Sequence, residues 1–219
     1  MDDQSNSDHL NSSMTDLMTS LMVIFILLLL VFVHRTAGKD AAVTDVLLKR
    51  LLYEMKPQGF NENTIRPDPR DRNAILVIVP DRLMNFEAGQ SNLRPEGEEF
   101  LKRYIPDLAE VLCSDQFRSS IESIVVEGHT DTQPYAGRTA EESQSLNLKL
   151  SQDRSMVVVK NALADLSSME EKRGCFLEKL SASGRGEQEQ EATPDESRRV
   201  ILKIRVKVVD AVPLRAQVP

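Results

Sequence analysis

Asp16 is the ionisable residue with the most unusual surroundings in this sequence. It stands directly before residues 17–33, which carry no charge and in which Leu, Val, Ile and Phe dominate. Holding a carboxylate against lipid costs roughly 2.5 kcal/mol or more, so an ionisable group at the edge of an apolar helix predicts a functional site. Asp16 could take up and release protons if a partner supplied a polar path. The alternative is an interfacial acid at a helix start, where the helix dipole favours it.

Residues 14–33 predict a transmembrane helix, because twenty residues at about 1.5 Å each cover about 30 Å, the hydrocarbon thickness of a bilayer. A cleaved signal peptide would need a basic segment before a shorter apolar core. Residues 1–13 contain three Asp and no Lys or Arg, so we expect a retained anchor. The positive-inside rule predicts a cytoplasmic location for the side that follows the span, which holds His34, Arg35, Lys39, Lys49 and Arg50.

The composition excludes several classes of function. A net charge of −7 and a pI near 5.1 argue against a nucleic-acid partner. The sequence has no Cys/His cluster at metal-ligand spacing, no glycine-rich phosphate loop and no nucleophile motif. We therefore expect neither an enzyme nor a metal or cofactor site.

Cys113 and Cys175 are the two cysteines of the chain. In an oxidising compartment they could form a disulfide that closes about 62 residues, which the loop-entropy model values at roughly 4 kcal/mol. In a cytosolic domain two buried free thiols would be the usual arrangement. The sequence favours the disulfide, and two free thiols stay as the alternative.

The sequence divides into six segments. Residues 1–13 form an N-terminal tail, followed by the span at 14–33 and a helical segment at 34–56. The apolar residues of that helix have helical spacing, which fits either packing on its own domain or a parallel stalk between two copies; they are Val43, Val46, Leu47, Leu51 and Met55. Pro and Gly mark 57–73 as a linker that reaches about 56 Å when extended. A domain at 74–209 and a tail at 210–219 complete the chain.

The domain alternates strands with helices. Apolar patterning predicts strands at 75–79, 121–127, 176–183 and 200–208. It predicts helices at 95–113 and 145–166 and a short helix near Pro194. Strands separated by helices indicate an α/β fold, an α+β sandwich with helices on one face of a sheet.

Four ordered blocks resemble the OmpA-like peptidoglycan-binding domain. They are Gly128-His129-Thr130-Asp131, residues 147–155, Gly184-Arg185-Gly186-Glu187 and Ser197-Arg198-Arg199-Val200, preceded by an opening block with Phe86, Gly89, Leu93 and Pro95. The resemblance covers residues 74–207 and implies binding of the diaminopimelate-containing peptide of the bacterial cell wall.

The resemblance also implies roles for single residues. Diaminopimelate ends in an ammonium and a carboxylate, so its recognition requires an acid and an arginine. Asp131 would bind the ammonium and Arg154 the carboxylate, unless the two simply pair with each other. The remaining implied binding residues are Thr130, Asn147 and Leu150, which would shape the pocket, and Arg199 in the closing motif.

Residues 14–22 resemble the Asp-centred membrane motif of MotB-type stator subunits. The resemblance implies a homodimer inside a ring of a multi-span, MotA-like partner in the bacterial inner membrane. The N-terminus would be cytoplasmic and the wall-binding domain periplasmic, against the positive-inside rule. Asp16 would carry the transported ion, and a lone carboxylate with no further ligand set favours a proton. Thr19 and Ser20 could hydrate the site or simply pack at a helix interface.

The acidic N-terminal tail without Trp or Tyr resembles the ZorB branch of that family, which acts in Zorya anti-phage defence. This resemblance implies a ZorA-type ring whose cytoplasmic tail signals to downstream effectors. Two other functions stay open at this point: a flagellar stator subunit, and a passive tether between membrane and wall.

Overall fold

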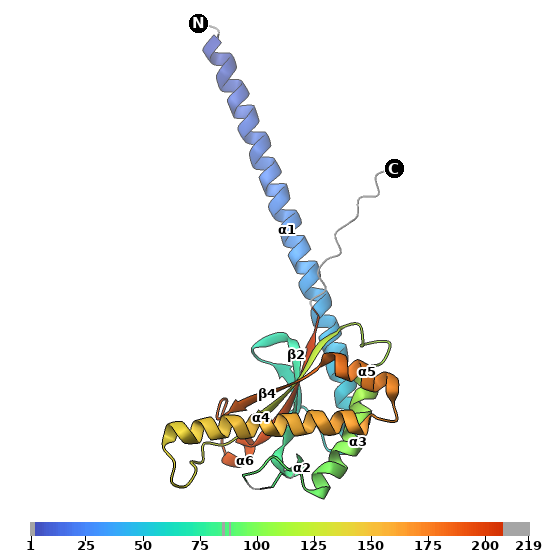
Figure 1. The fold of residues 1–219 in the computed structure, drawn as a ribbon. Helices are drawn as coiled ribbons and strands as arrows, with labels where there is room; N and C mark the ends of the chain where they lie inside the picture. The colour runs from blue at the N-terminus through green and yellow to red at the C-terminus, as the bar shows by residue number, and fades with distance from the viewer. Residues whose placement is uncertain (1–2, 85, 88, 208–219) are drawn as a thin grey trace. The chain divides into compact units, whose positions relative to one another are not determined.

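The computed structural model (Figure 1) describes residues 3–84, 86–87 and 89–207, and within its first helix it describes side chains at 17–33 and from 43 onward. The predicted tail at 210–219 and the side chain of Asp16 lie outside this set. The chain divides after Asp40 into two units, and the second comprises Ala41–Val208.

Helix α1 (Asp3–Met55) opens the chain. Its apolar side chains between positions 17 and 33 are all exposed, from 41% for Ile26 to 69% for Leu17. Among the residues with described side chains, no helix has both the length and the apolar character needed to cross a membrane. The span at 14–33 stays a prediction, part of which falls on side chains outside the described set.

The C-terminal turns of α1 belong to the core of the second unit. Leu47, Leu51 and Met55 are fully buried there, whereas Val46 and Tyr53 on the opposite face are 47% and 74% exposed. Residues four apart in a helix share one face, and the domain covers that face. Of the two arrangements that the sequence left open for 34–56, residues 43–55 therefore have the one that packs on their own domain, and the stalk is wrong for them.

A five-stranded sheet forms the centre of the domain, in the order β1-β2-β5-β3-β4. Its strands are β1 (Ile65–Asp68), β2 (Asp71–Pro80), β3 (Ile121–His129), β4 (Leu180–Gly186) and β5 (Arg199–Val206). Only β3 and β4 pair in parallel among the described strands. The predicted linker at 57–73 is wrong, because it contains η1 (Lys56–Gln58), β1 and the start of β2.

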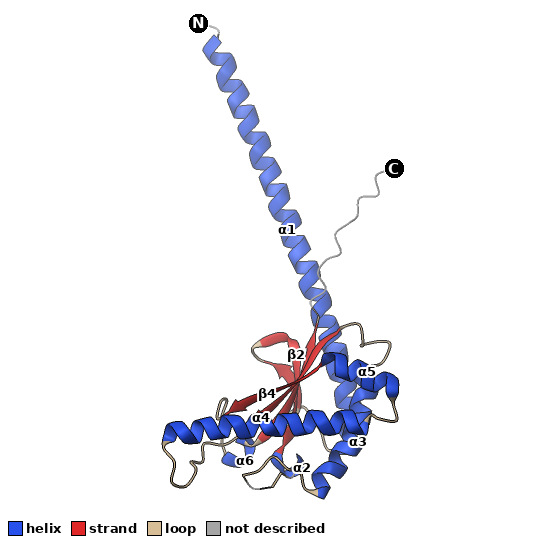
Figure 2. Ribbon diagram, viewed as in Figure 1, coloured by secondary structure: helices blue, strands red, loops and turns tan. Residues whose placement is uncertain are grey.

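Helices cover one face of this sheet (Figure 2). This layer consists mainly of α3 (Pro95–Leu112), α4 (Ala140–Asp165) and α5 (Glu170–Lys179). The short helices α2 (Asp81–Met84) and α6 (Pro194–Ser197) follow β2 and precede β5, respectively. Helix α4 begins earlier than the predicted 145, because Thr139 and Glu142 form a capping box. The strand predicted at 176–183 begins only at Leu180. Residues 176–179 belong to α5 instead, and Phe176 is buried as part of that helix.

The alternating strands present their apolar residues to the helices. In β5, Val200, Leu202, Ile204 and Val206 belong to the buried core together with residues of α3. Cys113 at the end of α3 and Cys175 in α5 form a disulfide, with 6.1 Å between their Cα atoms. The structure thus has the disulfide rather than the two free thiols.

The buried face of α1 gives a first prediction. Leu51→Ala should lower the free energy of unfolding by about 2–5 kcal/mol, because it leaves a cavity in the core. Val46→Ala on the exposed face should change it by less than about 0.5 kcal/mol. Urea unfolding of the full chain in detergent measures both. Equal unfolding midpoints for Leu51→Ala and the parent chain would contradict the packing of α1 on the domain.

Candidate functional site

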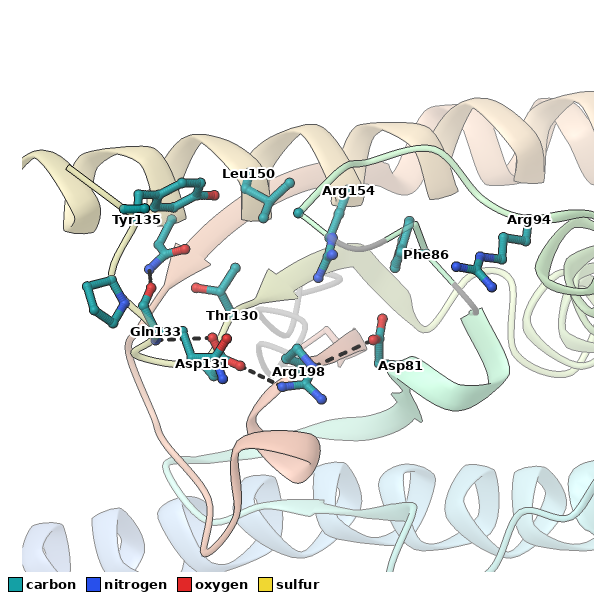
Figure 3. A pocket seen from close by; sticks show the side chains of 14 residues that line it. Asp81, Phe86, Arg94, Thr130, Asp131, Gln133, Tyr135, Leu150, Arg154 and Arg198 are labelled. Carbon is teal, nitrogen blue, oxygen red and sulfur yellow. Dashed lines mark hydrogen bonds and ion pairs between the residues drawn. The ribbon is translucent and has the colours of Figure 1, made fainter. Parts of the chain in front are cut away.

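A cavity of about 650 Å³ opens where β3, α4 and the segment before β5 meet (Figure 3). Five of the six residues predicted for peptide binding line it: Thr130, Asp131, Asn147, Leu150 and Arg154. Its other lining residues are Asp81, Phe86, Gly89, Arg94, Gln133, Pro134, Tyr135, Ala136 and Arg198. The predicted residues, which are spread over 25 positions of the sequence, therefore share one site.

Close packing of α4 on β3 positions the predicted residues. A Cβ atom on Gly128 would lie 2.1 Å from the backbone oxygen of Ser151, so a side chain cannot fit at this position of the strand. The Ser151 hydroxyl in turn accepts a hydrogen bond from the backbone N–H of Gly186, at 2.8 Å. Residues three and four apart share a helix face, and α4 thereby presents Asn147, Leu150 and Arg154 to the cavity.

Asp131 lies two residues after the end of β3 and is almost fully buried. Its carboxylate accepts hydrogen bonds from Nη1 of Arg198, at 2.6 Å, and from the backbone N–H of Gln133, at 3.2 Å. Among the described residues no ion pair joins Asp131 to Arg154. The structure therefore does not have the alternative of a direct ion pair between Asp131 and Arg154.

Arg154 is 5% exposed and is held by two contacts. Its Nε donates a hydrogen bond to the backbone oxygen of Gln90, at 3.0 Å, and its guanidinium carbon lies 4.8 Å from the centre of the Phe86 ring. Burial lowers the pKa of Arg154, and the nearby Asp81 carboxylate opposes that shift. Its terminal nitrogens make no hydrogen bond with a described residue, so the donors that could bind a carboxylate are available.

The loop after β4 supports the cavity from behind. Asn147 donates a hydrogen bond to the Glu187 carboxylate at 2.8 Å, and Gln190 donates one to the backbone oxygen of Thr130 at 2.9 Å. Glu189 in the same loop has φ = 61°, a left-handed conformation that non-glycine residues seldom adopt. The side chains of Arg70 and Arg185 both pair with its carboxylate.

Arg199 lies in a different place from the one its motif implied. It lines a second cavity, of about 260 Å³, which does not include the five residues above. Its guanidinium donates to the backbone oxygen of Glu189 at 2.8 Å and pairs with Glu191 at 3.4 Å. Consecutive residues of an extended chain point in opposite directions, so its neighbour Arg198 faces the first cavity instead.

Sequence reasoning missed several residues of the site. Arg198 bridges the two acids of the cavity, because its Nε lies 3.7 Å from Asp81 and its Nη1 bonds to Asp131. In the sequence, its position beside Arg199 in the closing motif could have indicated this role. Burial raises the pKa of the Asp81 carboxyl, which the charge of Arg154 opposes. Phe86 stood in the opening block without an assigned role. Arg94, Gln133 and Tyr135 gave no signal of their own.

The cavity combines separate acidic acceptors and guanidinium donors, a set suited to a ligand with an ammonium and a carboxylate. Within the described residues, no group of three or more His, Cys, Asp or Glu side chains could hold a metal ion.

Comparisons with known proteins agree with this geometry. Residues 85–201 match the family model described as the OmpA family. The Zorya protein ZorB of Escherichia coli is 24% identical over 204 residues, covering 88% of this chain and 86% of the relative. The crystal structure of a putative MotB-like protein from Desulfovibrio vulgaris has the same fold, with a TM-score of 0.56 at 18% identity over 78% of this chain and 98% of its own length.

His129, at the end of β3, gives a prediction about acid stability. Its side chain is fully buried, and desolvation lowers its pKa to about 4 from 6.5, with the charge of Arg199 adding to the shift. The folded state therefore binds fewer protons than the unfolded state between these values, and stability should fall as pH decreases through that window, by about 3 kcal/mol in all.

Urea unfolding at pH 7, 6, 5 and 4.5 measures this loss. His129→Gln should lack the His129 part of the pH dependence, while the carboxylates contribute equally to both proteins. The same pH dependence in parent and variant would contradict a neutral, buried His129.

Proposed function

The chain belongs to the OmpA family, and from that premise we propose that it is the peptidoglycan-anchored B subunit of a proton-driven, stator-like membrane motor in a Zorya-type anti-phage system. The resemblance to ZorB over most of both chains supports the Zorya assignment. The fold shared with a MotB-like protein is consistent with a stator subunit.

The observation that carries wall binding is the separation of Asp131 from Arg154 in one cavity. Arg198 and the Gln133 N–H hold the carboxylate, while Gln90 and Phe86 hold the guanidinium. Two opposite charges kept apart in this way are complementary to the ammonium and the carboxylate of diaminopimelate. Thr130, Asn147 and Leu150 line the same cavity.

Arg154→Gln should weaken binding to peptidoglycan about tenfold to a hundredfold, the usual effect of losing a hydrogen bond to a charged group. Co-sedimentation of the full chain, in detergent, with purified insoluble peptidoglycan measures the affinity. Arg138→Gln is the matched control, because Arg138 is exposed beside α4 and lies outside the cavity. Equal sedimentation of the Arg154 variant and the parent chain would refute the assignment.

We further propose that residues 14–33 cross the inner membrane, with the N-terminus cytoplasmic and the domain periplasmic. Apolar side chains exposed on all sides of a helix need an apolar environment. The disulfide between Cys113 and Cys175 fits an oxidising compartment. The exposed apolar side chains support the crossing, and the disulfide favours a periplasmic domain over the orientation that the positive-inside rule predicts.

In this proposal a homodimer sits inside a ring of ZorA- or MotA-like subunits. Asp16 carries protons, with Thr19 and Ser20 beside it on the next turn. Each charge that crosses releases about 2.3 kcal/mol per 100 mV, which turns the ring against the wall-anchored dimer. The ring then passes the signal to cytoplasmic effectors.

Asp16→Asn should abolish phage resistance in cells that carry this chain with its neighbouring genes, because an amide cannot carry the proton. Plaque counts at equal protein level measure the effect. Asp8→Asn, an equivalent change in the N-terminal tail, should leave resistance intact.

The other outcomes distinguish the competing functions. Resistance that survives Asp16→Asn but not Arg154→Gln would favour a passive membrane-to-wall tether. Swimming that depends on the chain, without restriction of any phage, would favour a flagellar stator subunit.

A further inference from the structure

Arg94 is a charged residue of the first cavity whose role the proposed function leaves open. It directly precedes α3 and is exposed at the rim. Its side chain makes no ion pair or hydrogen bond with any residue that the structure describes, unlike Arg154 and Arg198. An arginine at the rim of a cavity without a protein partner is free to bind a ligand group.

The local chain brings Arg94 close to the proposed binding residues. Phe86 and Leu93 form an isolated β-bridge, and the backbone N–H of Glu87 donates to the oxygen of Asn92 at 2.9 Å. This pairing sets Arg94 next to the aromatic ring against which Arg154 packs. Figure 3 shows the Arg94 guanidinium extending toward the side of the cavity that Phe86 and Asp81 line.

The carboxylates at the cavity are engaged by arginines other than Arg94. Arg198 pairs with Asp131, lies 3.7 Å from Asp81 and also pairs with Asp195, which does not line the cavity. Arg94 pairs with none of these acids. A ligand end with one ammonium and one carboxylate is neutral, so it would leave the charge of Arg94 uncompensated.

We propose that Arg94 binds a second carboxylate of the wall peptide, outside the ammonium-and-carboxylate end that Asp131 and Arg154 hold. This inference rests on the proposed wall binding and adds to it a preference among peptides. A cavity of about 650 Å³ lies in the range that accommodates ligands larger than a single side chain. The site then prefers a peptide with a net charge of −1 to one whose second carboxylate is capped as an amide.

The test uses the synthetic tripeptide L-Ala-γ-D-Glu-meso-diaminopimelate and two derivatives, each amidated at one of its carboxylates outside the zwitterionic end. Calorimetry gives the affinity of each peptide for the full chain in detergent, for Arg94→Gln and for Arg154→Gln. Arg103→Gln is the matched control, because Arg103 is exposed on α3 and does not line the cavity.

The parent chain should bind the unmodified tripeptide about five- to tenfold more tightly than one of the two amides. Arg94→Gln should bind these two peptides equally, at the affinity of the parent chain for that amide. The Arg103 variant should behave like the parent chain. This loss of discrimination is a coupling between residue and ligand group, which a general structural defect would not produce.

Two results would overturn the inference alone: a parent chain that binds all three peptides equally, or an Arg94 variant that changes all three affinities by the same factor. A parent chain that binds none of the peptides, or an Arg154 variant that binds the tripeptide as the parent does, would overturn the proposed wall binding as well. The affinity of the Arg154 variant therefore separates the two failures.

Discussion

The close contact between α4 and the glycines of the parallel strand pair is the constraint on which the site depends. A Cβ atom on Gly184 would lie 2.7 Å from the backbone nitrogen of Gln152, and the clash at Gly128 is closer still. The Gln152 side chain accepts the Gly184 N–H at 2.6 Å, so helix and strand are also joined by hydrogen bonds. Because α4 is held at this short distance from the strands, Arg154 contacts Phe86 and Asn147 bonds to the loop after β4. Larger residues at either glycine would lift the helix and move every α4 side chain of the cavity together.

Within this frame, the site is kept open by the way its charges are paired. A buried carboxylate and a buried guanidinium attract each other strongly at low dielectric, and a direct pair would fill the cavity with its own salt bridge. Arg198 prevents this by bonding to Asp131 from the strand side, while a backbone oxygen and an aromatic face hold Arg154. The Asp131 carboxylate and the Arg154 guanidinium each have a protein partner that uses some of their hydrogen-bonding positions, and the other positions face the cavity. These contacts offset part of the free-energy cost of burying the two charges before a ligand binds.

How far the sequence predicts this structure depends on the kind of pattern in each segment. Apolar patterning identified β2, β3 and β5: β2 contains a short, continuous apolar run, and β5 shows the alternation with period two that is specific to strands. It misplaced residues 176–179, since a short apolar run does not distinguish a strand from a helix. It missed β1 because Pro67 suggested a linker, although an edge strand tolerates proline. In the site, motif matching located five residues that line the cavity. It selected Arg199 rather than Arg198, because the direction of each side chain depends on where β5 begins, which the motif does not state.

The place of β1 in the sheet also limits how far the segment between α1 and the sheet can extend. As a linker, residues 57–73 would have extended about 56 Å. In the structure, Ile65, Arg66 and Pro67 pair with β2, and Phe60 lies in the core stacked on Tyr104. Because the last turns of α1 are buried in the same core, no free tether remains between that helix and the sheet. Extending this segment would require β1 to leave β2 and would expose Leu47, Leu51 and Ile65, at a free-energy cost of several kcal/mol. Residues 43–73 can therefore extend only if this edge of the sheet opens.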